Sequence, residues 1–252
     1  MQVTEHIDAL ERDGKRLVSV ARASNLDLPV PTCPGWRLAD LLAHIGFVHH
    51  WAASYVSHGW TEMVPEKDEP EVFGTAPGPA LLVGWAEEGH AGLVEALRGA
   101  PGDLRCWTFL PAPSPLAFWA RRQAHETAVH RADAELARAG AVTPFEPAFA
   151  ADGIDELLFG FLARRKRQGD EGAPEGSMVL EATDFAASWT VRIRAKRVTA
   201  LAGDHGGDLS VRATASDLYL FAWNRRGVQG LEVSGNRDVI KRWQESARVR
   251  WA

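Results

Sequence analysis

The sequence predicts an α+β protein made of an N-terminal four-helix bundle and a smaller C-terminal α+β domain. Apolar residues recur at helical spacing through about the first two-thirds of the 252 residues, whereas their spacing drops to two after Gln168. Between these regions lies the polar, glycine-rich stretch 169–177, of the kind that separates domains. We therefore predict one domain over residues 1–167 and a second over residues 178–252.

Four principal helices are expected in the first domain. The first three helices are predicted from apolar residues at helical spacing: Ile7, Leu10, Leu17 and Ala21 in the first, Leu41, Val48 and Tyr55 in the second, and Leu82, Trp85, Leu93 and Leu97 in the third. The fourth helix is predicted from about Leu116 to Ala139, and Gly140 would end it. A fifth helical segment spans 154–162. The proline-containing stretches 64–79 and 106–115 are predicted to be loops. Helices joined by long connections form a bundle whose core can hold a site.

The second domain is predicted from short segments in which apolar and polar residues alternate. The expected strands are 179–183, 189–194, 198–201, 209–213 and 231–233, and the expected helices are 217–225 and 237–246. The alternation is clearest where Trp189, Val191 and Ile193 are interleaved with threonine and arginine. Such a mixture of short strands and helices is typical of a small α+β domain.

Composition and charge exclude several classes of function. Hydrophobic residues make up 46% and charged residues 24%, and the formal net charge of -5 argues against a nucleic-acid partner. The short basic run 164–167 is interpreted as the solvated end of a helix. No apolar run approaches the ~20 residues that a membrane-spanning helix needs, and Cys33 and Cys106 lack the spacing of a disulfide or CxxC motif. We therefore expect a cytoplasmic protein without a membrane partner. The sequence does not indicate whether the protein is a monomer or an oligomer.

Three residues form the candidate site. Glu126 and His130 are four residues apart and therefore share one helix face, while His44 lies on the apolar stripe of the second helix. Two imidazoles and one carboxylate are a ligand set for a divalent metal that leaves a position open for chemistry. The alternatives are that His44 is a core histidine satisfied by one hydrogen bond, and that Glu126 and His130 belong to a solvated helix face.

Neighbouring residues could complete this site. His49 is predicted to contact a metal ligand or the substrate, and Trp36 and Trp51 could line a pocket. The sequence contains no P-loop, no dinucleotide-binding fingerprint and no G-x-S-x-G nucleophile motif. The candidate chemistry therefore rests on the two histidines and the glutamate.

Two further runs of the chain are Val-Pro-Thr-Cys-Pro-Gly-Trp-Arg-Leu-Ala-Asp-Leu-Leu-Ala-His (30–44) and Glu-Thr-Ala-Val-His-Arg-Ala-Asp-Ala-Glu (126–135). Both runs resemble signatures of the mycothiol-dependent maleylpyruvate isomerase family of DinB-like metalloenzymes. The segments 188–192 and 224–235 are similar to the sterol-carrier-protein-like domain often found with that bundle. The resemblance covers nearly the whole chain. Members are typically actinobacterial, which agrees with 23 arginines against 5 lysines.

The resemblance implies that His44, Glu126 and His130 bind zinc or a similar divalent metal, and that the cofactor is mycothiol, a low-molecular-weight thiol. The bound thiolate would add to the cis double bond of a maleylpyruvate-type substrate, and elimination after rotation would return the trans product. The resemblance also suggests that an arginine of the second domain, Arg225 or Arg226, faces the site. Arg225 would pair with a substrate carboxylate.

Two other functions stay open at this point. The protein could be a mycothiol S-transferase, which conjugates or exchanges the thiol on a small-molecule electrophile and consumes one thiol per product. It could also be a non-catalytic small-molecule-binding protein, which would hold an apolar ligand in its second domain and would carry no tightly bound metal.

Overall fold

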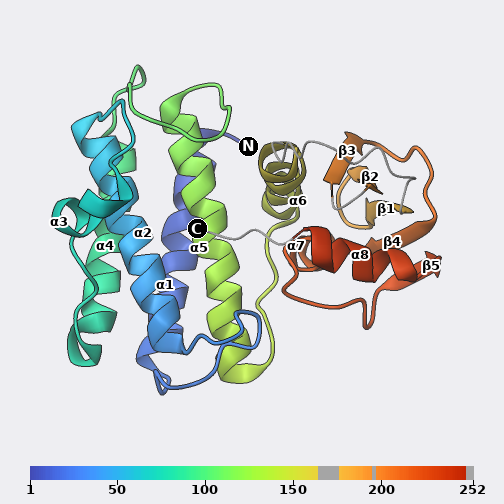
Figure 1. Ribbon diagram of the computed structural model, residues 1–252, viewed down its shortest axis with the longest axis horizontal. Coiled ribbons are helices and arrows are strands. Elements are labelled where there is room, and N and C mark those ends of the chain that lie inside the picture. Colours follow the sequence, from blue (N-terminus) through green and yellow to red (C-terminus); the bar gives the residue numbers. More distant parts are fainter. Residues whose placement is uncertain (164–175, 195–196, 248–252) are drawn as a thin grey trace. The chain divides into compact units, whose positions relative to one another are not determined.

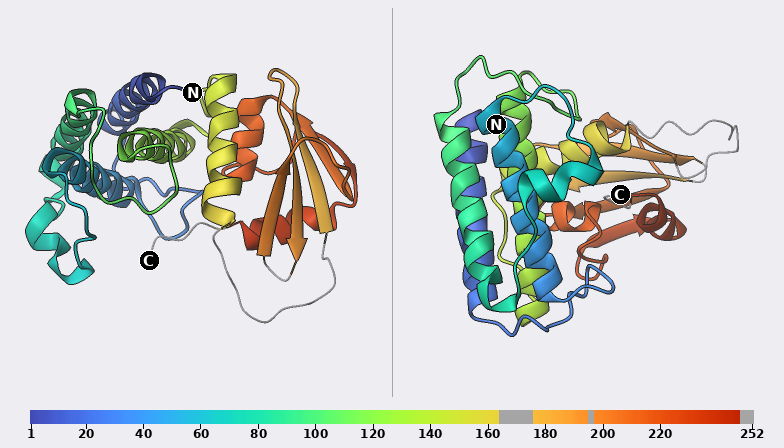
Figure 2. Two further views of the ribbon diagram at one scale, coloured as in Figure 1. Left: turned by 90° about the horizontal axis from the view of Figure 1, so that it is seen from above. Right: turned by 60° about the vertical axis from the view of Figure 1, so that its left-hand side comes forward.

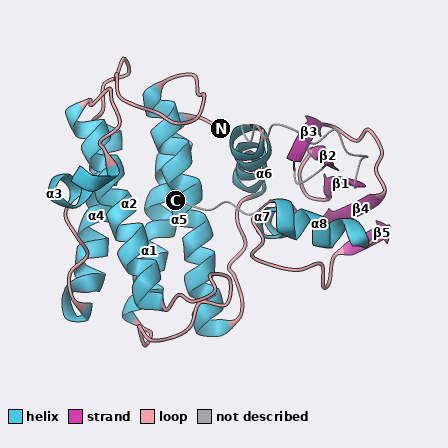
Figure 3. Ribbon diagram, in the orientation of Figure 1, coloured by secondary structure: helices cyan, strands magenta, loops and turns pink. Residues whose placement is uncertain are grey.

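The computed structural model describes residues 1–163, 176–194 and 197–247. The chain divides into two compact units, Met1–Thr143 and Pro144–Ala252. The basic run 164–167 and residues 169–175 of the predicted linker lie outside the described residues. Helices alone build the first unit, whereas the second combines helices with a sheet (Figure 3).

Four long helices form the first unit (Figure 1). They are α1 (Val3–Arg22), α2 (Leu38–His58), α4 (Pro79–Gly99) and α5 (Pro115–Ala139). Helix α1 packs on α5 and α4, and α2 packs on the same two helices, so that the four close around one core. The predicted four-helix bundle is confirmed.

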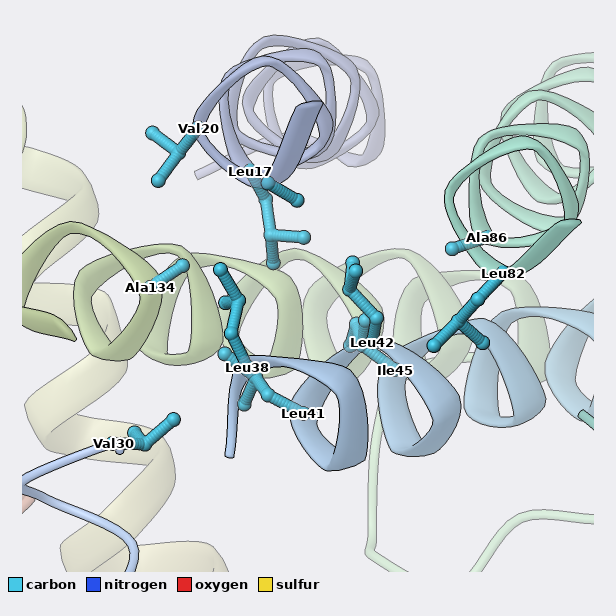
Figure 4. Packing of buried hydrophobic residues seen from close by; sticks show 11 residues of the cluster. Leu17, Val20, Val30, Leu38, Leu41, Leu42, Ile45, Leu82, Ala86 and Ala134 are labelled. Atoms are coloured by element: carbon cyan, nitrogen blue, oxygen red, sulfur yellow. The ribbon is translucent and has the colours of Figure 1, made fainter. Parts of the chain in front are cut away.

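Leucines at helical spacing on α2 fix how that helix is turned in the bundle. Leu38, Leu41, Leu42 and Ile45 are each no more than 1% exposed, and they form the stripe that an amphipathic helix presents to a core. Residues from the other helices and from the loop before α2 pack around them (Figure 4). These are Leu17 and Val20 of α1, Leu82 and Ala86 of α4, Ala134 of α5, and Val30 of the loop. His44 lies between Leu42 and Ile45, so this packing also sets the direction in which His44 points.

Local sequence signals set both ends of α5. The Ser114 hydroxyl accepts a hydrogen bond from the Ala117 N–H, which caps the start of the helix. Gly140 has a left-handed conformation (φ 67°) and its N–H donates to the Leu136 carbonyl, as glycine does at helix ends. The predicted end at Gly140 is confirmed.

The stretch 64–79 is more ordered than a loop. It contains a 3-10 turn, η1 (Glu66–Asp68), and a short helix, α3 (Glu69–Phe73). Phe73 is buried, with its ring centroid 6.0 Å from that of Tyr55. The prediction of a loop was wrong here because a helix of five residues is too short to show an apolar period.

The second unit contains a five-stranded sheet in the order β3-β2-β1-β4-β5 (Figure 2). The strands are β1 (Gly176–Ala182), β2 (Ser188–Arg194), β3 (Arg197–Ala202), β4 (Leu209–Ala213) and β5 (Glu232–Gly235). Strands β1 and β4 are parallel, and the other pairs are antiparallel. Helices α7 (Ala215–Ala222) and α8 (Asp238–Ser246) pack on β1. The predicted strands and helices are all present within a few residues.

The boundary between the two compact units lies earlier in the sequence than the predicted domain boundary. Helix α6 (Pro147–Asp155) and the π-helical segment η2 (Glu156–Leu162) pack on α7 and β3 of the second unit. The indole of Trp189 donates to Asp155 at 2.7 Å. The compact units therefore divide between Thr143 and Pro144 and not over residues 168–177. Apolar periodicity shows that a helix has a buried face, but it does not say which core buries it.

Two leucines of α4 test the packing of the bundle. Leu93 is 0% exposed and Leu81 is 69% exposed. We expect Leu93→Ala to lower the free energy of unfolding by about 2–5 kcal/mol, because it leaves a cavity. Leu81→Ala should change it by less than about 0.5 kcal/mol. Urea unfolding followed by tryptophan fluorescence measures both, and equal effects of the two substitutions would contradict the described core.

Candidate metal centre

The structure brings the three predicted metal ligands together. His44 lies on α2, and Glu126 and His130 lie on α5. The Oε1 atom of Glu126 is 3.2 Å from Nε2 of His44 and 3.3 Å from Nε2 of His130. One ligand atom from each residue lies within 4.8 Å of the other two. The two imidazoles therefore both point their Nε2 atoms at Oε1 of Glu126.

These distances fit a metal ion. Zinc lies about 2.0–2.1 Å from histidine nitrogen and from carboxylate oxygen, so that tetrahedral geometry places ligand atoms about 3.3 Å apart. The two nitrogen–oxygen distances are 3.2 and 3.3 Å. Two imidazole nitrogens and one carboxylate oxygen suit zinc and other first-row divalent ions. The residues present are thus able to hold such an ion.

The polar residues of α5 around the candidate centre are buried and do not form a solvated face. The side chains of Glu126 and His130 are 5% and 7% exposed, whereas that of His44 is 20% exposed. A buried carboxylate is costly unless cations or hydrogen-bond donors compensate it. The cluster is therefore most open at His44.

Arg122 binds the second oxygen of Glu126. It lies one helical turn before Glu126 and donates from Nη2 to Oε2 at 2.9 Å, so Oε1 is left to face the histidines. Burial alone would raise the pKa of Glu126. Hydrogen bonds from His130 and His44, together with the charges of His130 and Arg122, instead lower that pKa well below its usual value. The carboxylate is therefore ionised, as a metal ligand must be.

Asp133 binds the other nitrogen of His130. The Nδ1 atom of His130 donates to Oδ2 of Asp133 at 2.9 Å, a pattern that is usual for metal-binding histidines. Burial would lower the pKa of His130, but the hydrogen bonds to Asp133 and Glu126 raise it to about 9. His130 is thus protonated at neutral pH in the metal-free protein, and a metal must displace that proton.

A loop before α2 completes the cluster. The Thr32 hydroxyl donates to Oδ1 of Asp133 at 2.5 Å, and the Cys33 sulfur lies 3.5 Å from Oδ2. Cys33, His130 and Asp133 form a second group of ligand atoms within 4.8 Å of one another. Thr32, Cys33 and Asp133 were not among the predicted site residues. For Asp133 the available signal was its position three residues after His130 on the same helix.

Trp36 lies against the candidate ligands. Its ring centroid is 5.2 Å from that of His44 and 6.3 Å from that of His130, to which it is nearly parallel. Trp51 packs elsewhere, with Tyr55, Trp107 and Trp119 in an aromatic cluster. Of the two predicted pocket tryptophans, the structure brings Trp36 to the histidines.

His49 lies deeper in the bundle. It is 2% exposed, and its Nε2 atom is 2.8 Å from the Thr127 hydroxyl. Its ring centroid is 5.5 Å from that of His90. These contacts are those of a structural core histidine, and its predicted contact with substrate stays a prediction.

The two candidate arginines lie in the second unit, directly after α7. Asn224 has a left-handed backbone (φ 58°) that turns the chain there. Arg226 forms an ion pair with Asp217 and donates to the Gln229 carbonyl at 2.7 Å. Arg225 donates to the Trp223 carbonyl at 2.8 Å. The carboxylate partner of Arg226 thus lies on α7 of the same unit.

Two models of protein domains match the chain. The mycothiol maleylpyruvate isomerase N-terminal domain matches residues 7–135, which are about half of the chain, and the MDMPI C-terminal domain matches residues 148–242. The chain belongs to the mycothiol-dependent maleylpyruvate isomerase family. The family resemblance predicted from residues 30–44 and 126–135 is confirmed.

Solved structures show the same fold. The crystal structure of the mycothiol-dependent maleylpyruvate isomerase superposes with a TM-score of 0.63 at 16% identity, over 94% of this chain and 95% of that chain. A histidine-to-alanine mutant of that isomerase gives a TM-score of 0.63 at 15% identity and the same coverage. No curated protein sequence matches the chain. None of the helices in the described parts has the length and hydrophobicity that crossing a membrane requires.

Elemental analysis tests the metal centre. We expect about one divalent ion per chain after expression in metal-replete medium, and loss of that ion in a His44→Ala, Glu126→Ala double variant. The control is His58→Ala, which removes an exposed histidine at the end of the same helix and should keep the ion. Equal metal content in the double variant and the control would exclude this site.

Buried histidines predict that stability depends on pH. Burial lowers the pKa of His49 well below its usual 6.5, and burial also lowers that of His90. Below about pH 6.5 these two histidines bind protons in the unfolded chain but stay neutral in the folded protein. The free energy of unfolding should therefore fall as the pH falls. The thermal unfolding midpoint of metal-free protein between pH 6.5 and 5 measures this, because the raised pKa of His130 changes stability in the opposite direction only above about pH 6.5. His49→Gln should make the dependence shallower, and an unchanged slope would contradict a neutral buried His49.

Proposed function

We propose that this chain is a mycothiol-dependent metalloenzyme in which His44, Glu126 and His130 bind a divalent metal such as zinc. The observation that carries the proposal is the convergence of three ligand atoms, in which Oε1 of Glu126 lies 3.2 and 3.3 Å from the Nε2 atoms of His44 and His130. It occurs in a member of a family named for a mycothiol-dependent reaction. A divalent ion held there would lower the pKa of a small thiol that reaches its open position and so supply a thiolate nucleophile at neutral pH.

The chain's own residues prepare this chemistry in three ways. Arg122, which binds Oε2 of Glu126, keeps this carboxylate ionised together with His130 and His44 and leaves Oε1 available. Asp133 binds Nδ1 of His130, so that Nε2 is the nitrogen offered to the metal. Trp36 covers part of both histidines and limits the access of water. Two neutral imidazoles and one carboxylate leave a bound dication with a net charge near +1, which favours an anionic thiolate.

The reaction proposed is cis–trans isomerisation of a maleylpyruvate-type substrate. One crystal structure with the same fold is that of the mycothiol-dependent maleylpyruvate isomerase. Such a substrate carries carboxylates, for which arginine is the natural partner. Arg225 and Arg226 of the second unit are the two candidates for that role, and Arg226 also forms an ion pair with Asp217.

Turnover of a maleylpyruvate-type substrate with mycothiol tests the proposal. Isomerisation regenerates the thiol, so catalytic amounts should suffice and the product should not retain it. Glu126→Ala should lower thiol-dependent turnover by about 100-fold or more, since even residues that only support metal ligands contribute 10- to 100-fold. His58→Ala serves as the matched control and should retain wild-type turnover.

The remaining outcomes separate the alternatives. Consumption of one thiol per product would indicate a mycothiol S-transferase instead of an isomerase. Thiol-dependent turnover that survives in Glu126→Ala would exclude the metal centre from the reaction. A protein with neither metal nor turnover, purified with a bound small molecule, would favour the non-catalytic binding role.

A further inference from the structure

Asp133 is the most deeply buried acidic residue next to the candidate metal centre. It is 0% exposed and lies one turn after His130 on α5. Its carboxylate contacts His130 through Oδ2 and Thr32 through Oδ1. A buried carboxylate with such partners has a defined orientation, because moving it would break hydrogen bonds that water cannot replace.

The bond from His130 to Asp133 determines which nitrogen of His130 is available. A neutral imidazole carries one N–H, and an ionised carboxylate can only accept a hydrogen bond. A proton therefore stays on Nδ1, which is 2.9 Å from Oδ2 of Asp133. When a metal displaces the second proton of the imidazolium, the lone pair lies on Nε2, the atom that faces Oε1 of Glu126 at 3.3 Å. The opposite tautomer would place a hydrogen where the metal belongs.

The loop before α2 holds Asp133 in turn. The Val30 N–H donates to the Trp36 carbonyl at 2.9 Å, and the Trp36 N–H donates to the Cys33 carbonyl at 2.9 Å, so the loop is closed on itself. Gly35 has a positive φ of 89°, which a side chain would strain. This closed loop delivers the Thr32 hydroxyl to Asp133 and the Trp36 ring to His130.

We propose that Asp133 is a positioning residue that sets the tautomer and direction of His130, and that Thr32 fixes Asp133 for this task. The inference rests on the metal centre of the proposed function and extends it to the Thr-Cys-Pro-Gly-Trp run of the loop. Carboxylates that orient metal-binding histidines typically contribute 10- to 100-fold to metal affinity. Neither Asp133 nor Thr32 needs to touch the metal or the substrate.

The test is the affinity of the full-length protein for Zn²⁺, measured by competition with a chromophoric chelator. Asp133→Ala should weaken zinc binding by about 10- to 100-fold, and Thr32→Val by a smaller factor. The matched control is Thr127→Val, which removes another buried hydroxyl bonded to a histidine, at 2.8 Å from His49. That control should leave zinc affinity unchanged.

A double variant separates positioning from simple loss of packing. In Asp133→Asn the amide can keep its carbonyl oxygen on Nδ1 only if its NH₂ group turns toward the Thr32 hydroxyl, which can accept. Asp133→Asn alone should therefore bind zinc better than Asp133→Ala does. Adding Thr32→Val removes that acceptor, so the NH₂ group would turn to His130 and push the proton onto Nε2. The combined loss should exceed the product of the two single losses by about tenfold or more.

Each result has one meaning. If wild-type protein binds no zinc, the proposed function fails. If wild type binds zinc and Asp133→Ala binds it equally well, the metal centre stands and the positioning role falls. If Thr127→Val weakens zinc binding as much as Asp133→Ala does, the effect comes from a general loosening of α5, which also overturns the positioning role. Thermal unfolding of the metal-free variants checks that each one folds.

Discussion

Glu126 places an ionised carboxylate inside a helical bundle, where a charge persists only if donors and cations surround it. Arg122 supplies the cation one turn earlier on α5, and His44 and His130 approach the remaining oxygen. The same arrangement that stabilises the carboxylate also makes it suitable to bind a metal ion, because two imidazole nitrogens converge on one oxygen. Removing a partner from such a buried group is costly, typically about 3–5 kcal/mol, so the partners depend on one another.

Helix α5 also contains a second group of buried charged residues, which pairs with α1. Further along it, Arg131 binds Asp13 of α1 at 3.2 Å and Glu135 at 2.6 Å, so a second buried ionic cluster ties α5 to α1. Buried ion pairs of this kind contribute little net stability compared with apolar packing. Their geometry does set how far α5 is shifted along α1. The face of α5 that carries Glu126 and His130 is thereby held in place by contacts outside the candidate metal centre.

Bundle and loop have separate roles at the site. The leucine stripe of α2 turns His44 inward, and this needs only apolar packing. The 30–36 loop adds Thr32, which binds Asp133, and Trp36, whose ring lies against the histidines. Membership of the family rests on matches over both units, whereas the proposed reaction depends on these few side chains. A bundle of this kind can keep its fold while substitutions in the loop change what the site does.

The sequence by itself determined the four helices of the bundle, the alternating strands, and the pairing of Glu126 with His130, because apolar period and four-residue spacing are local properties of the chain. Tertiary structure alone decided that α6 joins the second unit and that Trp36 lies at the histidines while Trp51 packs in the aromatic cluster. It also decided that Thr32 meets Asp133 across 101 positions of sequence. Contacts of this kind depend on which buried surfaces pack together, and a periodic pattern shows that a surface is buried without naming its partner.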